Sequence, residues 1–256
     1  MTNSRAVVSD QARVADDVTI GPFSVIGPDV EIGPGCWIGP HVVVNGPTRI
    51  GRDNRIFQFA SVGEMAQDKK FRGEHAALEI GDGNTIREFV TINRGTGEGG
   101  GVTRVGDRNW IMAYCHVAHD CSIGNDTVFA NNASLAGHVE VADHVVLGGY
   151  SLVHQFCRLG ESALLAFGAH VDRDVPPFLI AAGQRAVPRG INTEGLKRRS
   201  FSPESMKGLK RAYRELFRGS NRLEDALGSL DDMAVEAPAI AQLVRFIRES
   251  QRGVIR

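Results

Sequence analysis

The sequence is poor in aromatic residues and carries almost no net charge. Only 17 of its 256 residues are Phe, Trp or Tyr, and 29 Lys and Arg stand against 30 Asp and Glu. A formal charge of −1 gives no reason to expect nucleic acid as a partner. No stretch approaches the roughly 18 apolar residues that span a bilayer, so we expect no transmembrane segment.

Signals for export and for paired cysteine chemistry are also missing. The residues that follow Met1 do not show the basic and then apolar pattern of a signal peptide. The four cysteines include no CxxC pair, which is the usual mark of a redox or zinc motif. We therefore expect a cytoplasmic protein.

What the sequence has instead is a strict repeat of six residues. Every sixth residue is apolar across residues 8–62, 80–92 and 105–171, which makes 25 positions. A helix repeats every 3.6 residues and a strand every two, so neither alone gives a period of six. A short strand followed by a turn does, and Gly-Pro pairs such as Gly21-Pro22 supply the turn chemistry.

The repeat resembles the hexapeptide-repeat family. That resemblance implies a mainly β fold, a left-handed parallel β-helix shaped like a triangular prism, with three hexads in each coil. The fifth residue of most hexads is small, as a narrow prism requires, and all four cysteines occupy this position. We therefore expect the cysteines to be small buried residues rather than nucleophiles or ligands.

Two domains are predicted, a β-helix catalytic domain over residues 1–191 and a small α-helical domain over residues 192–256. Loops at 63–79 and 93–104 interrupt the hexads, and loops of this kind are functional candidates. The second loop contains the Gly-rich run 95–101, but no GK[ST] follows it and no helix opens there. We interpret this run as a flexible flap rather than a phosphate loop.

The C-terminal region has helical patterning and a different charge. Ser202 followed by Pro is typical of a helix start, and apolar residues three or four apart predict a helix as far as Leu216. Residues 223–233 and 238–250 predict two more helices. Residues 192–256 carry 13 basic and 9 acidic side chains, a net +4, whereas the remainder carries −5. This asymmetry fits either an ordinary solvated surface or a basic face for an acidic partner.

Residues 18 apart are expected to lie one coil apart, about 4.8 Å along the prism, so polar residues at that spacing form columns. One column consists of His119, Gly137 and Gln155. The next column consists of Asp120, His138 and Phe156. His154 lies beside the first column, and His116 precedes His119 by three residues. This clustering of polar and ionisable side chains predicts the functional site.

Segments 116–121, 131–138 and 154–157 closely resemble the UDP-N-acetylglucosamine O-acyltransferase family. Further matches at 67–70 and 192–199 extend the resemblance nearly end to end. It implies transfer of an (R)-3-hydroxyacyl group from acyl carrier protein to the glucosamine 3-hydroxyl of UDP-N-acetylglucosamine, the first step of lipid A biosynthesis. It also implies a homotrimer with active sites between subunits, no metal, and no cofactor beyond the acyl carrier protein thioester as co-substrate.

The resemblance assigns three catalytic roles. His119 matches the general base, Asp120 the residue that orients it, and the Gly137 N–H the donor to the thioester oxyanion. An imidazole is suited to accept a hydroxyl proton near neutral pH, and a carboxylate can hold it in one tautomer. The substrate-binding positions that match the family are Gln67, Asp68, Lys70, His116, His138, His154, Gln155, Asn192, Glu194, Arg198 and Arg199.

One residue departs from the family pattern. Phe167 stands where the long-chain members have Gly and a shorter-chain member has Met. A bulky ring there is expected to close the acyl pocket, so we expect a preference for acyl chains of about C10 to C12 over C14. The alternative is that the pocket simply shifts around the ring.

Three other functions are compatible with the repeat. A related hexapeptide acyltransferase could use a 3-amino sugar nucleotide or acyl-CoA. A zinc hydratase of the γ-carbonic anhydrase type needs three histidines, with one pair five residues apart. Here His116 and His119 are three apart, and His138 and His144 are six apart, so that ligand pattern is missing. A non-catalytic scaffold would not need clustered His, Asp and Arg side chains.

Overall fold

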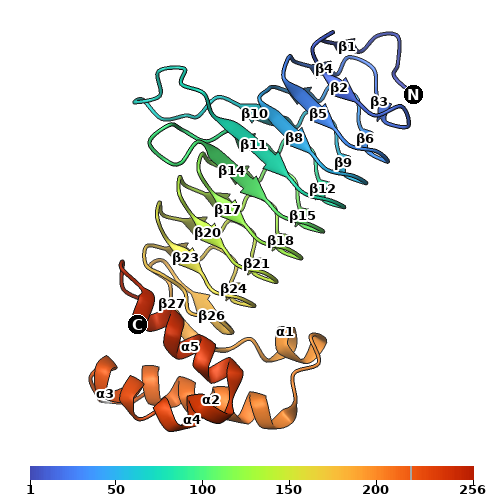
Figure 1. Cartoon of the computed structure of the whole chain (residues 1–256). Helices are drawn as coiled ribbons and strands as arrows, with labels where there is room; N and C mark the ends of the chain where they lie inside the picture. Colours follow the sequence, from blue (N-terminus) through green and yellow to red (C-terminus); the bar gives the residue numbers. More distant parts are fainter. Residues whose placement is uncertain (220) are drawn as a thin grey trace.

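The protein is a three-sided prism of short parallel strands with helices at one end (Figure 1). The computed structural model describes residues 1–219 and 221–256. Each turn of the chain adds one strand to each of three sheets, so neighbouring strands in a sheet are mostly three apart in chain order. This arrangement is the parallel β-helix of the hexad repeat, and it fits the left-handed form that the resemblance to the hexapeptide-repeat family implied.

The three sheets contain nine, eight and ten strands, and we number them by their first strand. Sheet 1 contains β1 (Val7–Val8), β4 (Val25–Ile26), β7 (Val43–Val44), β10 (Ser61–Glu64), β13 (Thr91–Asn93), β16 (His116–Val117), β19 (Ser134–Leu135), β22 (Leu152–Val153) and β25 (His170–Val171). Sheet 2 contains β2 (Arg13–Val14), β5 (Val30–Ile32), β8 (Thr48–Ile50), β11 (Ala77–Ile80), β14 (Val102–Val105), β17 (Ser122–Ile123), β20 (Glu140–Val141) and β23 (Arg158–Leu159). Sheet 3 contains β3 (Thr19–Ile20), β6 (Trp37–Ile38), β9 (Arg55–Ile56), β12 (Thr85–Ile86), β15 (Trp110–Ile111), β18 (Val128–Phe129), β21 (Val146–Leu147), β24 (Leu164–Leu165), β26 (Leu179–Ala182) and β27 (Val187–Ile191).

The apolar residue of each hexad fills the prism. Ile20, Val117 and Leu147 are typical, since each ends a short strand and has at most 1% of its surface exposed. The cysteines at the fifth positions are buried, as predicted. Burial raises the pKa of the Cys121 thiol to about 12, so this thiol stays protonated at neutral pH. That state agrees with an inert packing role.

Buried polar residues form a ladder along one corner of the prism. Asn54 Oδ1 accepts a hydrogen bond from Asn84 N at 2.9 Å, and Asn84 Oδ1 accepts one from Asn109 N at 2.8 Å. Asn109 Oδ1 in turn accepts from Thr127 N at 2.8 Å and from Thr127 Oγ1 at 2.6 Å. Each amide thereby satisfies a buried N–H group of the next coil, which an apolar side chain could not do.

The outer surfaces of the prism differ in chemistry. Sheet 2 presents basic and acidic residues that pair between coils, among them Arg13–Glu31 at 2.8 Å, Arg104–Glu79 at 3.2 Å and Arg158–Glu140 at 3.3 Å. The corner between sheets 3 and 1 instead carries a stack of rings, with centroids 4.8 to 5.2 Å apart. This aromatic corner consists of Phe23, His41, Phe59, Phe89 and Tyr114.

Helices cover the end of the prism that carries β26 and β27 (Figure 1). They are α1 (Thr193–Arg198), α2 (Pro203–Phe217), α3 (Leu223–Gly228), α4 (Asp231–Glu236) and α5 (Pro238–Glu249). Ser202 caps α2, as predicted, by accepting a hydrogen bond from Ser205 N. None of the described helices has the length and apolar character that crossing a membrane requires.

The single helix that we predicted over residues 223–233 is wrong. The chain forms two short helices there, because Gly228 ends α3 and acidic residues at Asp231 and Asp232 start α4. Gly is a weak helix former, and carboxylates favour a helix N-terminus, so the local sequence supports the break. Beyond α5 the chain returns to the prism, where Ile255 is buried in the same core as the hexad residues.

The asparagine ladder leads to a stability prediction. Replacing Asn109 by Ala leaves the buried N–H and hydroxyl of Thr127 without their acceptor. We expect the free energy of unfolding to fall by about 2 to 4 kcal/mol, since each unsatisfied buried group costs about 1 to 3 kcal/mol. Urea denaturation followed by circular dichroism measures the change. Asp10→Ala, at an exposed turn, is the control and should change the value by less than about 0.5 kcal/mol. Equal effects of the two substitutions would contradict the role of the ladder.

Candidate active site

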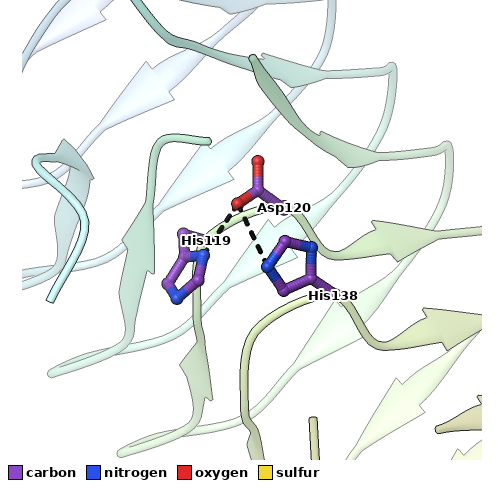
Figure 2. A group of neighbouring side chains, drawn as sticks. All are labelled: His119, Asp120 and His138. Atoms are coloured by element: carbon purple, nitrogen blue, oxygen red, sulfur yellow. Dashed lines mark hydrogen bonds and ion pairs between the residues drawn. The ribbon is translucent and has the colours of Figure 1, made fainter. Parts of the chain in front are cut away.

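The site lies at the corner between sheets 1 and 2, where the chain turns from β16 into β17. Asp120 has a φ of 60°, a left-handed conformation that lets the chain turn sharply. His119 Nδ1 lies 2.7 Å from Asp120 Oδ2. Figure 2 shows the His119 and His138 rings on either side of the Asp120 carboxylate, with the second nitrogen of His119 pointing away from it.

The carboxylate fixes how His119 can react. A buried carboxylate accepts hydrogen bonds, so His119 donates through Nδ1 and keeps Nε2 free to accept a proton. The Asp120 side chain is fully buried, whereas His119 keeps 15% of its side-chain surface exposed. This pair therefore has the arrangement of a general base with an orienting carboxylate.

Gly137 lies one coil further along and directly against the His119 ring. A Cβ atom at this position would lie 2.6 Å from His119 Cε1 and 2.7 Å from Nε2. Any side chain there would displace the imidazole, so the position requires Gly. Among the residues that the structure describes, none accepts a hydrogen bond from the Gly137 N–H. That donor is available for a reacting oxygen beside Nε2.

His138 completes the cluster. Its Nε2 lies 3.7 Å from Asp120 Oδ2, and its ring meets the His119 ring edge-on at 5.1 Å between centroids. It stacks on Phe156 at 4.4 Å, which is the contact that the second column predicted. Burial lowers the pKa of His138, and the Asp120 charge offsets part of that effect. A neutral imidazole at neutral pH can both donate and accept hydrogen bonds to a substrate.

Two threonines that the sequence analysis did not single out hold Asp120. Thr96 donates to the Asp120 carboxylate through its backbone N, at 2.8 Å from Oδ1, and through its Oγ1, at 2.7 Å from Oδ2. Thr103 Oγ1 accepts from Asp120 N at 2.8 Å. The Gly-rich run that we expected to be a flexible flap is thus anchored in the site. The one feature of the sequence that could have indicated this anchor was Thr96, a single threonine within the Gly-rich run.

The loop over residues 65–76 lies beside this anchored run. Gly97 N donates to Glu74 Oε1 at 3.2 Å, and Lys70 Nζ lies 3.9 Å from Glu98 Oε2. Gln67 and Lys70 are exposed, while Asp68 is half-buried and accepts a hydrogen bond from Lys70 N. The predicted substrate-binding residues of this loop therefore reach solvent next to the His119 cluster, and their contacts with substrate stay predictions.

The other histidines of the predicted site lie along sheet 1. Thr91 Oγ1 lies 2.7 Å from His116 Nδ1, and burial lowers the pKa of His116. His154 is exposed, and its Nδ1 lies 2.9 Å from Nη2 of Arg252, a residue near the chain end that the sequence analysis missed. Gln155 beside it is also exposed. An arginine that reaches this corner adds a positive charge where an anionic group could bind.

The predicted residues of α1 lie elsewhere in the same chain. Asn192 caps α1 by accepting from Gly195 N, and its Nδ2 donates to the Ser162 carbonyl oxygen at 3.0 Å. Glu194 pairs with Lys197 at 2.9 Å. Arg199 pairs with Glu161 at 2.6 Å and also contacts the Ser162 hydroxyl, while Arg198 is exposed. Because Asn192 is 4% exposed with both amide atoms bonded, its structural role here is to hold α1.

Phe167 is the most exposed ring near the aromatic corner, with 78% of its surface accessible. It meets Tyr150 edge-on at 5.7 Å. Its ring also covers Gly149, where a Cβ atom would lie 3.5 Å from Phe167 Cδ2. The ring therefore stands out from the prism between sheets 3 and 1, rather than in the interior.

An open groove extends from the His119 cluster across sheet 2 to α5. Its lining includes Asp120, His138, Phe156, Arg158, Arg245 and Arg252. His119, Asp120 and His138 also place one possible metal-ligand atom each within 4.8 Å of one another. The Asp120 oxygens already accept three hydrogen bonds from Thr96 and His119, so hydrogen bonding alone accounts for the geometry of the group.

Comparison with known protein families covers both parts of the chain. A family model described as bacterial transferase hexapeptide (six repeats) matches residues 11–46 and 103–137. A second, described as Udp N-acetylglucosamine O-acyltransferase, domain 2, matches residues 174–255. The acyl-[acyl-carrier-protein]--UDP-N-acetylglucosamine O-acyltransferase of Halorhodospira halophila is 58% identical, over 98% of this chain and 97% of that protein.

Solved structures of related enzymes match this chain over its whole length. The UDP-N-acetylglucosamine acyltransferase of Francisella novicida has a TM-score of 0.97 and 43% identity, covering 100% of this chain and 94% of that one. The corresponding enzyme of Bacteroides fragilis has a TM-score of 0.98 and 39% identity, with 100% of both chains covered. The repeat and the helical region thus match one set of relatives from end to end, and the chain belongs to the UDP-N-acetylglucosamine O-acyltransferase family.

Proposed function

We propose that the chain transfers a 3-hydroxyacyl group from acyl carrier protein to the glucosamine 3-hydroxyl of UDP-N-acetylglucosamine, at the entry to lipid A biosynthesis. The relatives that match over the full length are named as acyl-[acyl-carrier-protein]--UDP-N-acetylglucosamine O-acyltransferases. The observation that carries the chemistry is the His119–Asp120 pair. Its free Nε2 lies beside the Gly137 N–H, for which the described residues supply no acceptor. A base and an oxyanion donor within one small corner suit attack on a thioester.

The reaction needs no covalent intermediate on the protein. His119 Nε2 accepts the proton of the sugar hydroxyl as the oxygen attacks the thioester carbonyl carbon. The charge that develops on the carbonyl oxygen is stabilised by the Gly137 N–H. The intermediate collapses with cleavage of the C–S bond, and the imidazolium returns its proton to the departing thiolate. Asp120 stabilises the transient positive charge on His119, as a buried carboxylate does in a catalytic triad.

A homotrimer with sites between subunits forms part of the proposal. In one chain, Arg199 at the end of α1 pairs with Glu161 in the turn between β23 and β24, whereas His119 lies at the corner between sheets 1 and 2. Since these are different corners of the prism, we propose that His119 and Arg199 of two copies bind one nucleotide sugar. The exposed aromatic corner offers apolar area that a neighbouring copy could bury.

Light scattering should give the mass of a trimer, and a monomer mass would contradict this arrangement.

The acyl preference follows from Phe167 in this proposal. The ring stands out from the prism beside Tyr150 and Gly149, where it could block the end of an acyl groove against a neighbouring subunit. An acyl chain longer than the groove that ends at the Phe167 ring would overlap the ring atoms and would be excluded. We therefore propose that the enzyme prefers an acyl chain shorter than C14.

Substitutions at His119 and Gly137 test the proposed activity. His119→Ala removes the base, and we expect acyl transfer to UDP-N-acetylglucosamine to fall by about 100- to 10,000-fold. Gly137→Ala should have a similar effect, because its Cβ would displace the His119 ring. Turnover is measured with a 3-hydroxyacyl carrier protein as donor. His144→Ala, outside the cluster, is the control and should retain activity. Transfer that survives His119→Ala would reject His119 as the base.

The Phe167 proposal is tested with mixed donors. Wild type and Phe167→Gly are each given a pool of 3-hydroxyacyl carrier proteins of different lengths, and the products are identified by mass spectrometry. We expect the shorter chains to dominate with wild type, and the preferred length to grow by about two to four carbons in the variant, since removing the ring opens about that much groove. Tyr150→Phe is the matched control and should keep the wild-type preference. The same length distribution for wild type and Phe167→Gly would refute the proposal.

A further inference from the structure

We propose that Thr96 is a positioning residue that sets the orientation of the Asp120 carboxylate, and through it that of His119. The proposal rests on the proposed function, because it needs His119 to act as the base. Thr96 belongs to the loop over residues 94–101, outside the hexad repeat, and its hydroxyl contacts the Asp120 carboxylate.

The contact between Thr96 and Asp120 has two points of attachment. The Thr96 N–H donates to Oδ1 at 2.8 Å, and the Thr96 hydroxyl donates to Oδ2 at 2.7 Å. Oδ2 is also the oxygen that accepts from His119 Nδ1 at 2.7 Å. Two donors on different oxygens fix the plane of the carboxylate, and that plane determines where the His119 ring can lie. Hydrogen bonds to a buried charge are stronger than those between neutral groups.

Burial makes this contact more important than it would be on the surface. The Asp120 side chain is fully buried, and Thr96 has 4% of its surface exposed. Water is therefore poorly placed to replace the hydroxyl if the side chain is changed. A carboxylate that loses a donor in such surroundings rotates toward whatever donors remain, and His119 moves with it.

The glycines of the loop support the same interpretation. A Cβ at Gly95 would lie 2.8 Å from Asp120 Oδ1, and one at Gly99 would overlap the carboxylate itself. The loop backbone thus packs directly against Asp120, and side chains are excluded on both sides of Thr96. Gly99 N and Gly101 N both donate to the Thr96 carbonyl oxygen, which closes the loop into a compact turn. The glycines let the loop backbone pack against Asp120, and Thr96 supplies the one hydroxyl of the loop to the Asp120 carboxylate.

A second threonine, Thr103, holds the backbone of Asp120, whereas Thr96 holds its carboxylate. Thr103 Oγ1 accepts from Asp120 N, so it holds the backbone of Asp120. The Asp120 backbone is therefore fixed from sheet 2, whereas its side-chain torsion is fixed from the 94–101 loop. Loss of the Thr96 hydroxyl should change the orientation of the carboxylate while the fold is retained.

The main test removes and then restores the hydroxyl. Thr96→Val keeps the side-chain shape, and we expect kcat to fall by about 10- to 100-fold, with the KM values of both substrates changed by less than about threefold. Thr96→Ser keeps the hydroxyl and should recover kcat to within about threefold of wild type. Thr96→Ala is a second hydroxyl-free variant, and Thr19→Val, at the far end of the prism, is the control. Thermal unfolding monitors folding in every case.

A double-mutant cycle separates positioning from a direct role. If Thr96 acts through Asp120, Thr96→Val should cost less than about threefold in an Asp120→Ala background. An unchanged kcat in both Thr96→Val and Thr96→Ala, or equal losses in both backgrounds, would overturn the proposal while the acyltransferase function stands. Full activity of His119→Ala would instead reject His119 as the base, and failure of wild type to transfer an acyl group would reject the proposed function itself.

Discussion

Backbone hydrogen bonds between stacked strands determine where side chains lie on the prism, and in the regular coils these strands are 18 residues apart. His116 pairs with Ser134, and Ser134 with Leu152. Because this spacing is fixed by the peptide groups, residues far apart in sequence meet at about 4.8 Å. The contact of Gly137 with His119 and the stacking of His138 on Phe156 both follow from it. The rigid β-helix therefore holds the side chains of the site in fixed positions on its surface, without a deep cavity.

The corner that carries His119 depends on a buried carboxylate, which the regular coils cannot provide. A hexad turn exposes its side chains, and an exposed carboxylate would be hydrated and free to rotate. The loop over residues 94–101 covers Asp120 and brings Thr96 to it, so the carboxylate is buried while His119 still reaches solvent. The same loop contacts the 65–76 loop through Gly97 and Glu74. Interruption of the repeat is thus the means by which a repetitive scaffold obtains a buried charge.

The sequence predicted most of the prism and its columns, because a period of six leaves few alternatives for the position of each side chain. The His119, Asp120 and Gly137 grouping was predictable for that reason. Thr96 was not, because a loop outside the repeat has no register from which its neighbours can be calculated. The split at Gly228 was missed because apolar spacing alone continues across it. Arg252 was missed because its contact with His154 requires the chain end to return to the prism, which is a tertiary effect.

The alternating charges on sheet 2 also affect how the molecule attracts partners over long distances. Opposite charges about 4.8 Å apart cancel at any range greater than their own spacing, so this face has almost no far field. Residues 192–256 carry a net +4, which is only partly offset by contacts such as that of Arg199 with Glu161, and this charge acts out to a Debye length of about 8 Å at physiological salt. An acidic carrier protein would therefore be attracted to the helical end rather than to the paired face of sheet 2.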